Sequence, residues 1–322
     1  MKALIFETFG GPEVLRYADI PEPRLEPGSV LVKMKAIGLN FADIYRRRGH
    51  YHLAGQPPYI LGYEGAGIVE QVALGVEGIQ VGDRIAFADV PYANAELVAV
   101  PVERAIPLPP EITYEQAAGV LLQGMTAHYL VNDSYDVKAG DEILVHAAAG
   151  GVGQLLTQLG KSKGARVIGL TSTEAKRDVA LKAGADEVLL YKSDWVKAVI
   201  AWSREKQGVS AAYDSVGSTL MESFAATKTK GHVIFYGMSG GDPVPVDPRM
   251  LMDASKTLTG GDLWNHVTTR ENRIARAYAL FAAMQQDHLH LESFKLFALR
   301  DGGEAHRLLE SRNSTGKIVL IP

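Results

Sequence analysis

The stretch Val145-His146-Ala147-Ala148-Ala149-Gly150-Gly151-Val152-Gly153 decides the fold class. It lies between a short apolar strand candidate and a segment whose apolar residues follow helical spacing. Aligned with the G-x-G-x-x-G fingerprint, it places Ala148, Gly150 and Gly153 at the three small positions. Small residues let the backbone approach a pyrophosphate, and a helix N-terminus presents free N–H groups to it. The alternative is a tight strand-to-helix turn without a ligand, and the surrounding pattern favours the dinucleotide site.

Strand-like and helix-like segments alternate after this turn. The predicted strands are residues 142–146, 166–170, 187–191, 211–215 and 232–236, with 256–260 as a candidate edge strand. The predicted helices are 151–163, 173–183 (capped by Thr173), 193–204, 220–227 and 269–286. Alternation at this spacing predicts a parallel sheet wound on both faces.

The first 120 residues have a different sequence pattern, in which short apolar runs are separated by Gly and Pro. The runs are 30–37, 66–72, 84–88 and 95–100, a spacing typical of a compact barrel or sandwich, and helix formers follow over 114–131. The tail returns to this mixed style, with strands over 294–299 and 317–321 and a helix over 303–311. We therefore predict an α/β protein with a β-rich domain over 1–122 and 290–322 and a dinucleotide-binding domain over 123–289.

Composition narrows the class of protein. The chain has 322 residues, enough for two domains at roughly 150 residues each. Its net charge of −4 argues against a general nucleic-acid binder, and the absence of cysteine excludes disulfides, iron–sulfur clusters and thiolate zinc sites. Neither a signal peptide nor an 18-residue apolar stretch is visible, so we expect a cytoplasmic protein with no membrane partner.

The second predicted strand indicates which dinucleotide binds. NAD sites usually carry an acidic residue about 20 positions after the first glycine. Here the strand ends in Leu170-Thr171-Ser172-Thr173 without a carboxylate, and Lys176 and Arg177 follow. Hydroxyls and a cation attract a 2′-phosphate that a carboxylate would repel, and Tyr191 offers a further phenol. The alternative is that these residues only cap and solubilise a helix; the combination favours NADPH over NADH.

Together these segments resemble the medium-chain dehydrogenase/reductase superfamily and, within it, the zinc-independent, zeta-crystallin-like quinone oxidoreductases. The resemblance covers essentially the whole chain. It is carried by Gly38-Leu39-Asn40-Phe41-Ala42-Asp43-Ile44-Tyr45, Leu61-Gly62-Tyr63-Glu64-Gly65-Ala66-Gly67, Val81-Gly82-Asp83-Arg84, the glycine turn, Tyr213-Asp214-Ser215-Val216-Gly217 and Gly316-Lys317-Ile318-Val319. It implies a GroES-like catalytic domain plus a Rossmann domain, with the C-terminal tail returning to the first.

The departures from the zinc members of this superfamily bear on the chemistry. Zinc alcohol dehydrogenases have Cys where Asn40 stands and His where Tyr63 stands, and Glu64 alone cannot hold a metal that needs about three protein ligands. The pairs His50/His52 and His288/His290 are interpreted as surface residues. We therefore expect no metal. Alcohol oxidation needs an electrophile, so the resemblance implies electron-poor acceptors instead, quinones or double bonds conjugated to a carbonyl.

The resemblance also implies the site residues. Asn40 and Tyr45 are the candidate catalytic residues, and Glu64 is expected to orient its neighbours. The candidate substrate residues are Tyr45, Tyr51, Tyr63 and Gln123. The candidate cofactor residues are Asn40, Phe41, Asp43, Tyr45, Thr126, Tyr129, Gly150, Gly151, Val152, Thr171, Ser172, Thr173, Lys176, Tyr191, Ser215, Val216, Tyr236, Gly237, Ser239, Gly240, Asp262, Leu263 and Lys317.

Several alternatives stay open at this point. Asn40 read alone is a turn residue, Tyr45 a core aromatic and Lys317 a solvated strand residue. Reduction of quinones is not separated from reduction of alkenals or enones, and a non-catalytic NADPH-binding protein of structural or RNA-binding type is a third possibility. Relatives associate edge to edge through the Rossmann sheet, which implies a homodimer.

Overall fold

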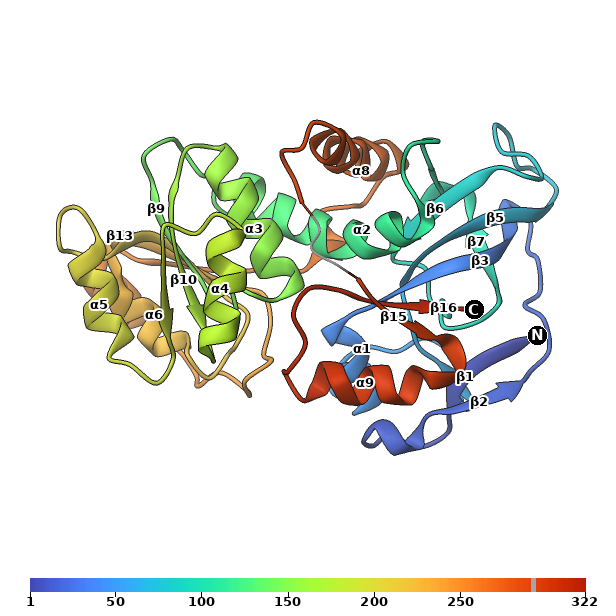
Figure 1. The fold of residues 1–322 in the computed structure, drawn as a ribbon, viewed down its shortest axis with the longest axis horizontal. Helices are drawn as coiled ribbons and strands as arrows, with labels where there is room; N and C mark the ends of the chain where they lie inside the picture. The colour runs from blue at the N-terminus through green and yellow to red at the C-terminus, as the bar shows by residue number, and fades with distance from the viewer. Residues whose placement is uncertain (291–293) are drawn as a thin grey trace. The chain divides into compact units, whose positions relative to one another are not determined.

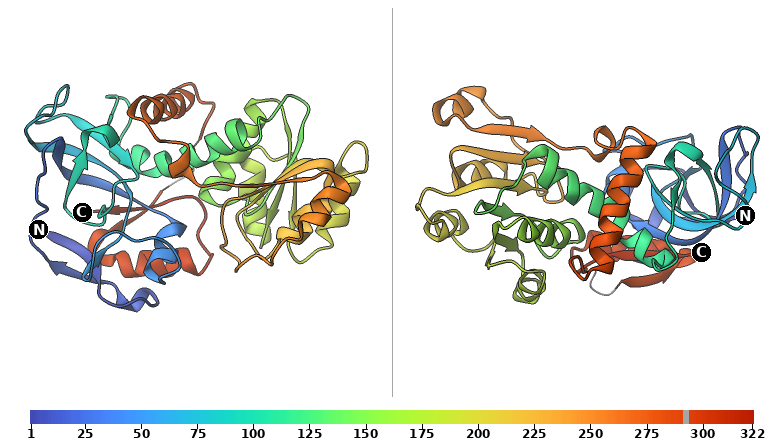
Figure 2. Two further views of the ribbon diagram at one scale, coloured as in Figure 1. Left: turned by 180° about the vertical axis from the view of Figure 1, so that it is seen from behind. Right: turned by 90° about the horizontal axis from the view of Figure 1, so that it is seen from above.

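The structure is a computed structural model that describes residues 1–290 and 294–322. The described chain divides into two compact units. Unit 1 contains residues 1–122, 267–282 and the described tail from 294 to 322, and unit 2 contains 123–266 and 283–290. Both chain termini lie in unit 1 (Figure 2). The domain bounds expected from the sequence stay a prediction, and the part of the 290–322 segment over 291–293 lies outside the described residues.

Unit 2 is built on a parallel six-stranded sheet. Its order is β11-β10-β9-β12-β13-β14, so the first strand in sequence lies inside the sheet and the chain winds outward from it in both directions. The strands are β9 (Glu142–Val145), β10 (Arg166–Thr171), β11 (Glu187–Leu190), β12 (Val209–Asp214), β13 (Thr227–Phe235) and β14 (Thr257–Gly260). This confirms the predicted doubly wound fold class, and β14 is an edge strand as expected.

Helices connect these strands by crossovers. They are α3 (Gly151–Ser162), α4 (Glu174–Lys182), α5 (Trp195–Trp202), α6 (Leu220–Ala226) and α7 (Pro248–Ala254). Figure 1 shows α3 and α4 on one face of the sheet and α5 and α6 on the other, as right-handed crossovers require when the winding direction reverses after β11. Reversal opens the carboxyl edge of the sheet between β9 and β12, where such folds bind ligands.

Unit 1 is rich in antiparallel strands. One sheet has the order β2-β1-β4 and the other β15-β16-β3-β5-β6-β8, with β7 also paired to β3. The strands are β1 (Lys2–Phe6), β2 (Arg16–Asp19), β3 (Ser29–Leu39), β4 (Tyr59–Ile60), β5 (Glu64–Val72), β6 (Arg84–Ala88), β7 (Leu97–Pro101), β8 (Ile106–Pro107), β15 (Lys295–Ala298) and β16 (Ile318–Ile321). Because β16 pairs with β3, the tail belongs to the same sheet as the N-terminal strands.

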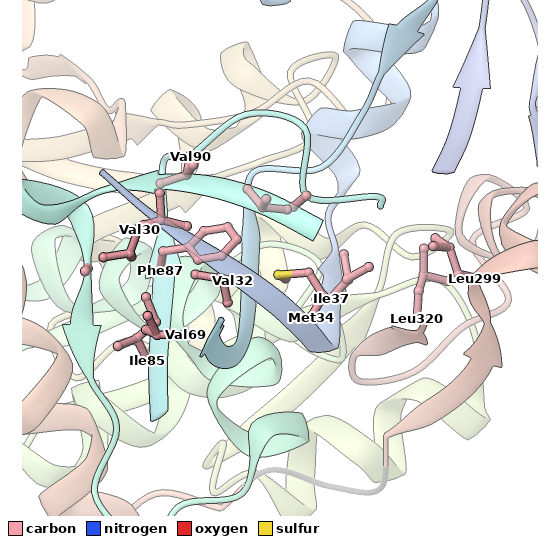
Figure 3. Packing of buried hydrophobic residues seen from close by; sticks show 14 of the residues in the cluster. Val30, Val32, Met34, Ile37, Val69, Ile85, Phe87, Val90, Leu299 and Leu320 are labelled. Carbon is pink, nitrogen blue, oxygen red and sulfur yellow. The ribbon is translucent and has the colours of Figure 1, made fainter. Parts of the chain in front are cut away.

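The core of unit 1 is formed by buried side chains from the strands of the larger sheet. Figure 3 shows Val30, Val32 and Met34 of β3 directed toward Val69, Ile85 and Phe87 of β5 and β6. All of them are buried. Burying a side chain of this size contributes about 1.5–3 kcal/mol, so this cluster stabilises the frame from which the loops and α1 project.

Two helices run through both units. The boundary between the units falls inside α2 (Tyr114–Tyr129), after Leu122, and inside α8 (Arg270–Gln285), after Ala282. A π-helical turn, Leu130–Ser134, continues α2. Within the described residues no helix is long and apolar enough to cross a bilayer.

A buried charge cluster fixes α1 (Phe41–Arg47) to α9 (Gly302–Glu310) in unit 1. The guanidinium of Arg47 is fully buried and donates to Glu310 at 2.6 Å, to His306 Nδ1 at 3.0 Å and to the Gly10 carbonyl at 3.1 Å. Burial, with the positive charge of Arg47, lowers the pKa of His306 to about 3. The imidazole therefore stays neutral, and its Nδ1 accepts the hydrogen bond that the Arg47 guanidinium donates.

Acid should destabilise unit 1 through His306. The pKa of this group is lower in the folded chain than its ordinary value of 6.5, so its contribution is present in full above pH 6.5 and is lost as pH falls toward 3. The loss is at most about 1.4 kcal/mol per pH unit. Urea unfolding at pH 6.5 and pH 5 should therefore show a fall in stability that is about 2 kcal/mol smaller in His306→Gln than in the native protein. Equal pH dependence of both proteins would contradict this assignment.

Candidate functional site

The glycine turn of unit 2 joins β9 to α3 through a residue in left-handed backbone conformation. Ala147 has φ +47°, and its carbonyl accepts the Gly150 N–H at 2.8 Å. Gly150 is the N-cap of α3 and has extended backbone. A Cβ on Gly153 would lie 2.4 Å from the Ala147 oxygen and 2.8 Å from the Ala148 Cα, so the turn closes only with glycine there. The first turn of α3 thus presents free backbone N–H groups without a side chain covering them from Gly151 or Gly153.

One of the α2 side chains that the sequence singles out lies close to this turn. A Cβ on Gly151 would meet the Gln123 Oε1 at 1.9 Å, so the Gln123 amide lies directly over the start of α3. Tyr129, further along α2, is buried and stacks on His266 with ring centroids 4.2 Å apart. Thr126 is half-buried on the same helix.

The tip of β10 carries hydroxyls. Thr171 is buried, Ser172 and Thr173 are exposed, and Thr173 Oγ1 accepts the Lys176 N–H at 3.3 Å as the cap of α4. The predicted capping role of Thr173 is therefore confirmed. Arg177 turns away, because its Nε donates to the Val188 carbonyl at 3.0 Å. Lys176 lies in the first turn of α4, next to these hydroxyls in sequence, and is half-buried.

The carboxyl ends of the neighbouring parallel strands β12 and β13 lie side by side at the same edge of the sheet. Ser239 donates from both its N–H and its hydroxyl to the Ser215 carbonyl, each at 3.0 Å, and the Gly240 N–H donates to the Val216 carbonyl at 2.8 Å. Tyr236 and Gly237 connect β13 to this loop. Beyond β14, the Asp262 carboxylate accepts the Trp264 N–H at 3.2 Å and Leu263 is buried. The predicted cofactor residues that follow β12, β13 and β14 therefore lie at the carboxyl edge of the sheet.

In unit 1, Asn40 begins α1 and its amide is held in one orientation. Nδ2 donates to Glu64 Oε2 at 2.8 Å, while Oδ1 accepts from Lys317 Nζ at 2.8 Å. The N3 residue of the helix, Asp43, accepts the Asn40 backbone N–H at 2.9 Å, as in a capping box. Asn40 is therefore fixed by neighbours from three separate segments of the chain.

Lys317 forms a buried ion pair. Its Nζ lies 2.6 Å from Glu64 Oε2, and both side chains are almost completely buried. The other oxygen of Glu64 accepts the Leu122 N–H at 2.7 Å. The alternative interpretation of Lys317 as a solvated strand residue is wrong, because the pairing of β16 with β3 carries the residue before β16 into the interior.

A second group of aromatic side chains surrounds Arg46, which sequence reasoning missed. Its guanidinium lies 3.7 Å from the ring centre of Tyr63 and 4.9 Å from that of Tyr51, and it pairs with Asp43 at 3.4 Å. The Tyr63 hydroxyl accepts the Ala54 N–H at 3.1 Å. Burial raises the pKa of Asp43 and that of Tyr63 against the opposing charge of Arg46. Only the spacing of Arg46 on α1, three residues after Asp43, signals the pair in sequence.

Three of the candidate substrate residues lie on α1 or against its Arg46 side chain. Tyr45 stands on α1 with its ring edge-on to Phe41 at 5.4 Å, and Tyr51 and Tyr63 flank Arg46. Gln123 is the one predicted acceptor residue in unit 2. His50, His52, His288 and His290 are exposed, and across residues 1–290 and 294–322 no group of three His, Asp or Glu side chains is placed to bind a metal.

The donor set beside Asn40 does not suit a divalent metal. The Glu64 carboxylate is neutralised by a cation of the chain itself, and the neighbouring polar groups are an amide and an ammonium. Neither is a usual zinc ligand. In unit 2, in contrast, the glycine turn and the hydroxyls of β10 suit a phosphorylated dinucleotide. Fold and site together define a two-unit dehydrogenase or reductase of the dinucleotide-binding type.

Comparison with known proteins identifies the family. Residues 26–137 match the alcohol dehydrogenase GroES-like domain and residues 151–280 match the zinc-binding dehydrogenase model. A quinone oxidoreductase of Pseudomonas aeruginosa is 37% identical over 100% of this chain and 99% of its own, and a 2-haloacrylate reductase of Burkholderia is 34% identical over 99% and 98%. The crystal structure of Escherichia coli quinone oxidoreductase complexed with NADPH superposes with a TM-score of 0.96 at 34% identity, covering 100% of both chains. The chain belongs to the quinone oxidoreductase family of the medium-chain dehydrogenase/reductase superfamily, which confirms the resemblance seen in the sequence.

Proposed function

We propose that this protein is an NADPH-dependent quinone reductase that works without a metal. The observation that carries the proposal is the Lys317–Glu64–Asn40 cluster: the Asn40 amide stands where the zinc enzymes of the superfamily have a cysteine ligand, and the Lys317 ammonium neutralises the Glu64 carboxylate beside it. Support comes from full-length relatives named quinone oxidoreductases and from one crystallised with NADPH. Without an electrophile to stabilise an alkoxide, an acceptor that is already electron-poor is the suitable substrate.

The residues of unit 2 bind the cofactor in this proposal. The N–H groups of Gly151 and Val152 face the pyrophosphate, and Ser172, Thr173 and Lys176 hold the 2′-phosphate. When bound, NADPH supplies the hydride. The remaining cofactor residues that we propose in unit 2 are Thr126, Tyr129, Gly150, Thr171, Tyr191, Ser215, Val216, Tyr236, Gly237, Ser239, Gly240, Asp262 and Leu263.

The residues of unit 1 orient the reacting groups. Tyr45, Tyr51 and Tyr63 are proposed to line the acceptor site, and Gln123 of unit 2 stays a candidate substrate residue from the sequence. Glu64 is committed to the donors of Asn40, Lys317 and Leu122, so it positions them and does not supply a proton. The reduced acceptor therefore takes its proton from solvent or a hydroxyl. Asn40, Phe41, Asp43, Tyr45 and Lys317 are the proposed cofactor residues of unit 1.

A screen of acceptors tests this function. Steady-state rates should be highest with NADPH and a quinone such as 1,4-benzoquinone or 9,10-phenanthrenequinone. The second candidate, reduction of an activated double bond, is favoured by the 34% identity to a 2-haloacrylate reductase. A higher kcat/KM for an α,β-unsaturated ketone or for 2-chloroacrylate than for either quinone would select it. Tight NADPH binding without turnover of any acceptor would instead indicate a non-catalytic binding protein.

Substituting Lys176 by Ala should change cofactor preference. The variant loses the cation beside the β10 hydroxyls, so we expect about 10-fold weaker NADPH binding, the equivalent of about 1.4 kcal/mol. NADH lacks the 2′-phosphate and should bind almost as before. Calorimetric titration of both nucleotides measures this, and equal losses for the two would refute the assignment. Arg177→Ala is the matched control, because that side chain is directed to Val188.

We also propose that two copies associate through the exposed edge of β14. Met252 and Val244, which precede this strand, are 71% and 57% exposed and would be available to a second copy. Light scattering at micromolar concentration should give twice the chain mass of 34.8 kDa. A mass of one chain would exclude the dimer. Cytoplasmic localisation stays a prediction from the sequence.

A further inference from the structure

Helix α1 of unit 1 ends in three consecutive arginines whose side chains make different contacts. Arg47 and Arg48 both pair with Glu310 of α9. Arg46 is fully buried and contacts instead the segment that follows the helix, residues 51–54, which lies outside regular helix and strand. A charge buried at this place must be offset by its partners, because removing it from water costs free energy.

The Arg46 guanidinium contacts three separate segments of unit 1. Its Nε donates to the His52 carbonyl at 3.1 Å, and the Tyr51 ring centre lies 4.9 Å from its central carbon. The Tyr63 ring centre lies 3.7 Å from the same carbon, within the range of a cation–π contact. Nη1 pairs with Asp43 at 3.4 Å, about one turn earlier on α1. Arg46 therefore connects residues 51–54, the residue before β5 and its own helix.

Two further hydrogen bonds extend this arrangement. The Tyr63 hydroxyl accepts the Ala54 N–H at 3.1 Å, so Tyr63 is held by its ring at Arg46 and by its oxygen at the segment 51–54. Asp43 accepts the Asn40 backbone N–H at 2.9 Å. Two of the side chains proposed to line the acceptor site are thus linked, through one guanidinium, to the residue that begins α1.

We propose that Arg46 is a positioning residue for the acceptor, because its guanidinium holds Tyr51 and Tyr63 in place as one side of the acceptor site, here called the acceptor wall. This rests on the proposed reduction of quinones and on the proposed acceptor residues. Arg46 is buried, so it acts through the two rings and not by contact with the acceptor. An aromatic surface binds a flat molecule through the area that it covers, so the acceptor wall should favour large planar quinones over small ones.

Arg46→Lys tests the proposal. Lysine keeps a positive charge near Asp43, but it loses the planar group that lies on Tyr63 and the Nε that bonds His52. We expect the KM for 9,10-phenanthrenequinone to rise about 10-fold, the effect of one lost hydrogen bond together with one lost cation–π contact. For 1,4-benzoquinone, which covers less of the acceptor wall, the rise should stay below about 3-fold. The dissociation constant of NADPH should stay at its native value.

Hydrogen exchange in the ligand-free protein gives a readout that does not depend on turnover. Amide exchange over residues 51–54 should accelerate in Arg46→Lys, because this segment loses its anchor on α1. Tyr63→Phe leaves the buried ion pair intact and removes only the oxygen that accepts the Ala54 N–H. We expect it to change exchange and the phenanthrenequinone KM in the same direction, by less than Arg46→Lys does.

Arg48→Lys is the matched control, because this side chain lies at the same end of α1, is half exposed and pairs with Glu310. Neither the KM values nor the exchange over residues 51–54 should change in it.

The outcomes separate positioning from a merely structural role of Arg46. A fall in kcat that is equal for both quinones, with native KM values, would show that the substitution only reduces the amount of folded protein, and it would overturn the proposal. Native exchange over residues 51–54 in Arg46→Lys would overturn it as well. Where Arg46→Lys does not fold, native KM and native exchange in Tyr63→Phe would contradict the acceptor wall. Failure of the native protein to reduce any acceptor would instead refute the proposed function, while exchange would still show whether Arg46 orders the segment 51–54.

Discussion

Lys317→Met should lower the free energy of unfolding by about 3–5 kcal/mol, the usual cost of removing one partner from a buried ion pair. The substitution leaves the Glu64 carboxylate buried with only Asn40 and the Leu122 N–H as donors, and it removes the donor to Asn40 Oδ1. Methionine fills a similar volume, so the loss reports the charge and not a cavity. Urea unfolding followed by circular dichroism measures it.

A second substitution distinguishes electrostatics from packing. In the double variant Lys317→Met/Glu64→Gln both charges are gone, so it should be more stable than Lys317→Met alone. The double-mutant cycle should give an interaction free energy of about 1 kcal/mol or more, as is usual for residues in contact. Lys33→Met is the matched control: Lys33 pairs with Glu70 at the surface, 3.3 Å apart, where such a pair contributes little. A loss below about 1 kcal/mol in Lys317→Met would mean that Glu64 is solvated, which contradicts the buried pair.

Gly153→Ala should disrupt the turn itself. The new Cβ would lie 2.4 Å from the Ala147 oxygen and 2.8 Å from the Ala148 Cα, and both obstacles are backbone that cannot swing aside. Forcing α3 away from β9 should cost about 1–3 kcal/mol of stability in the manner of an overpacked core. We expect at least a 10-fold loss of affinity for NADPH and NADH alike, because the displaced N–H groups serve the pyrophosphate.

The control for this variant lies in the same unit. Gly260→Ala adds the same methyl group at the end of β14, where a Cβ meets no atom within 4 Å, and it should leave nucleotide affinity unchanged. Calorimetric titration compares the two variants. Native affinity in Gly153→Ala would show that α3 does not need its close approach to β9, and the turn would lose its assigned role.

Local patterns were sufficient to predict unit 2. Each of its strands is a short apolar run next to a turn signal, and each helix has its own periodicity, so their alternation determines a parallel sheet. The sequence reading missed β1, β2, β4 and β8 as well as α7, which are short and carry weak signals. It also missed α1, which is only seven residues long. Arg47 is buried only through partners such as Glu310, which lies 263 positions away in the chain.

The same limit applies to the site. The sequence showed the residue types at Asn40, Glu64 and Lys317, but the pairing of Lys317 with Glu64 spans 253 positions and depends on how β16 meets β3. Likewise the contact of Arg46 with Tyr63 depends on where the residue before β5 lies relative to α1. Residue identity therefore predicts which chemistry is available, whereas the tertiary fold determines which polar groups are already committed to one another.

The measurement that tests the central claim most directly is NADPH-dependent reduction of 1,4-benzoquinone by protein dialysed against a chelator, with the zinc content determined on the same sample. We expect the native rate at a zinc content far below one ion per chain, because the buried ammonium of Lys317 already neutralises Glu64. Loss of the rate on chelation and its recovery with stoichiometric zinc would contradict hydride transfer in a site served by the residues of the chain alone.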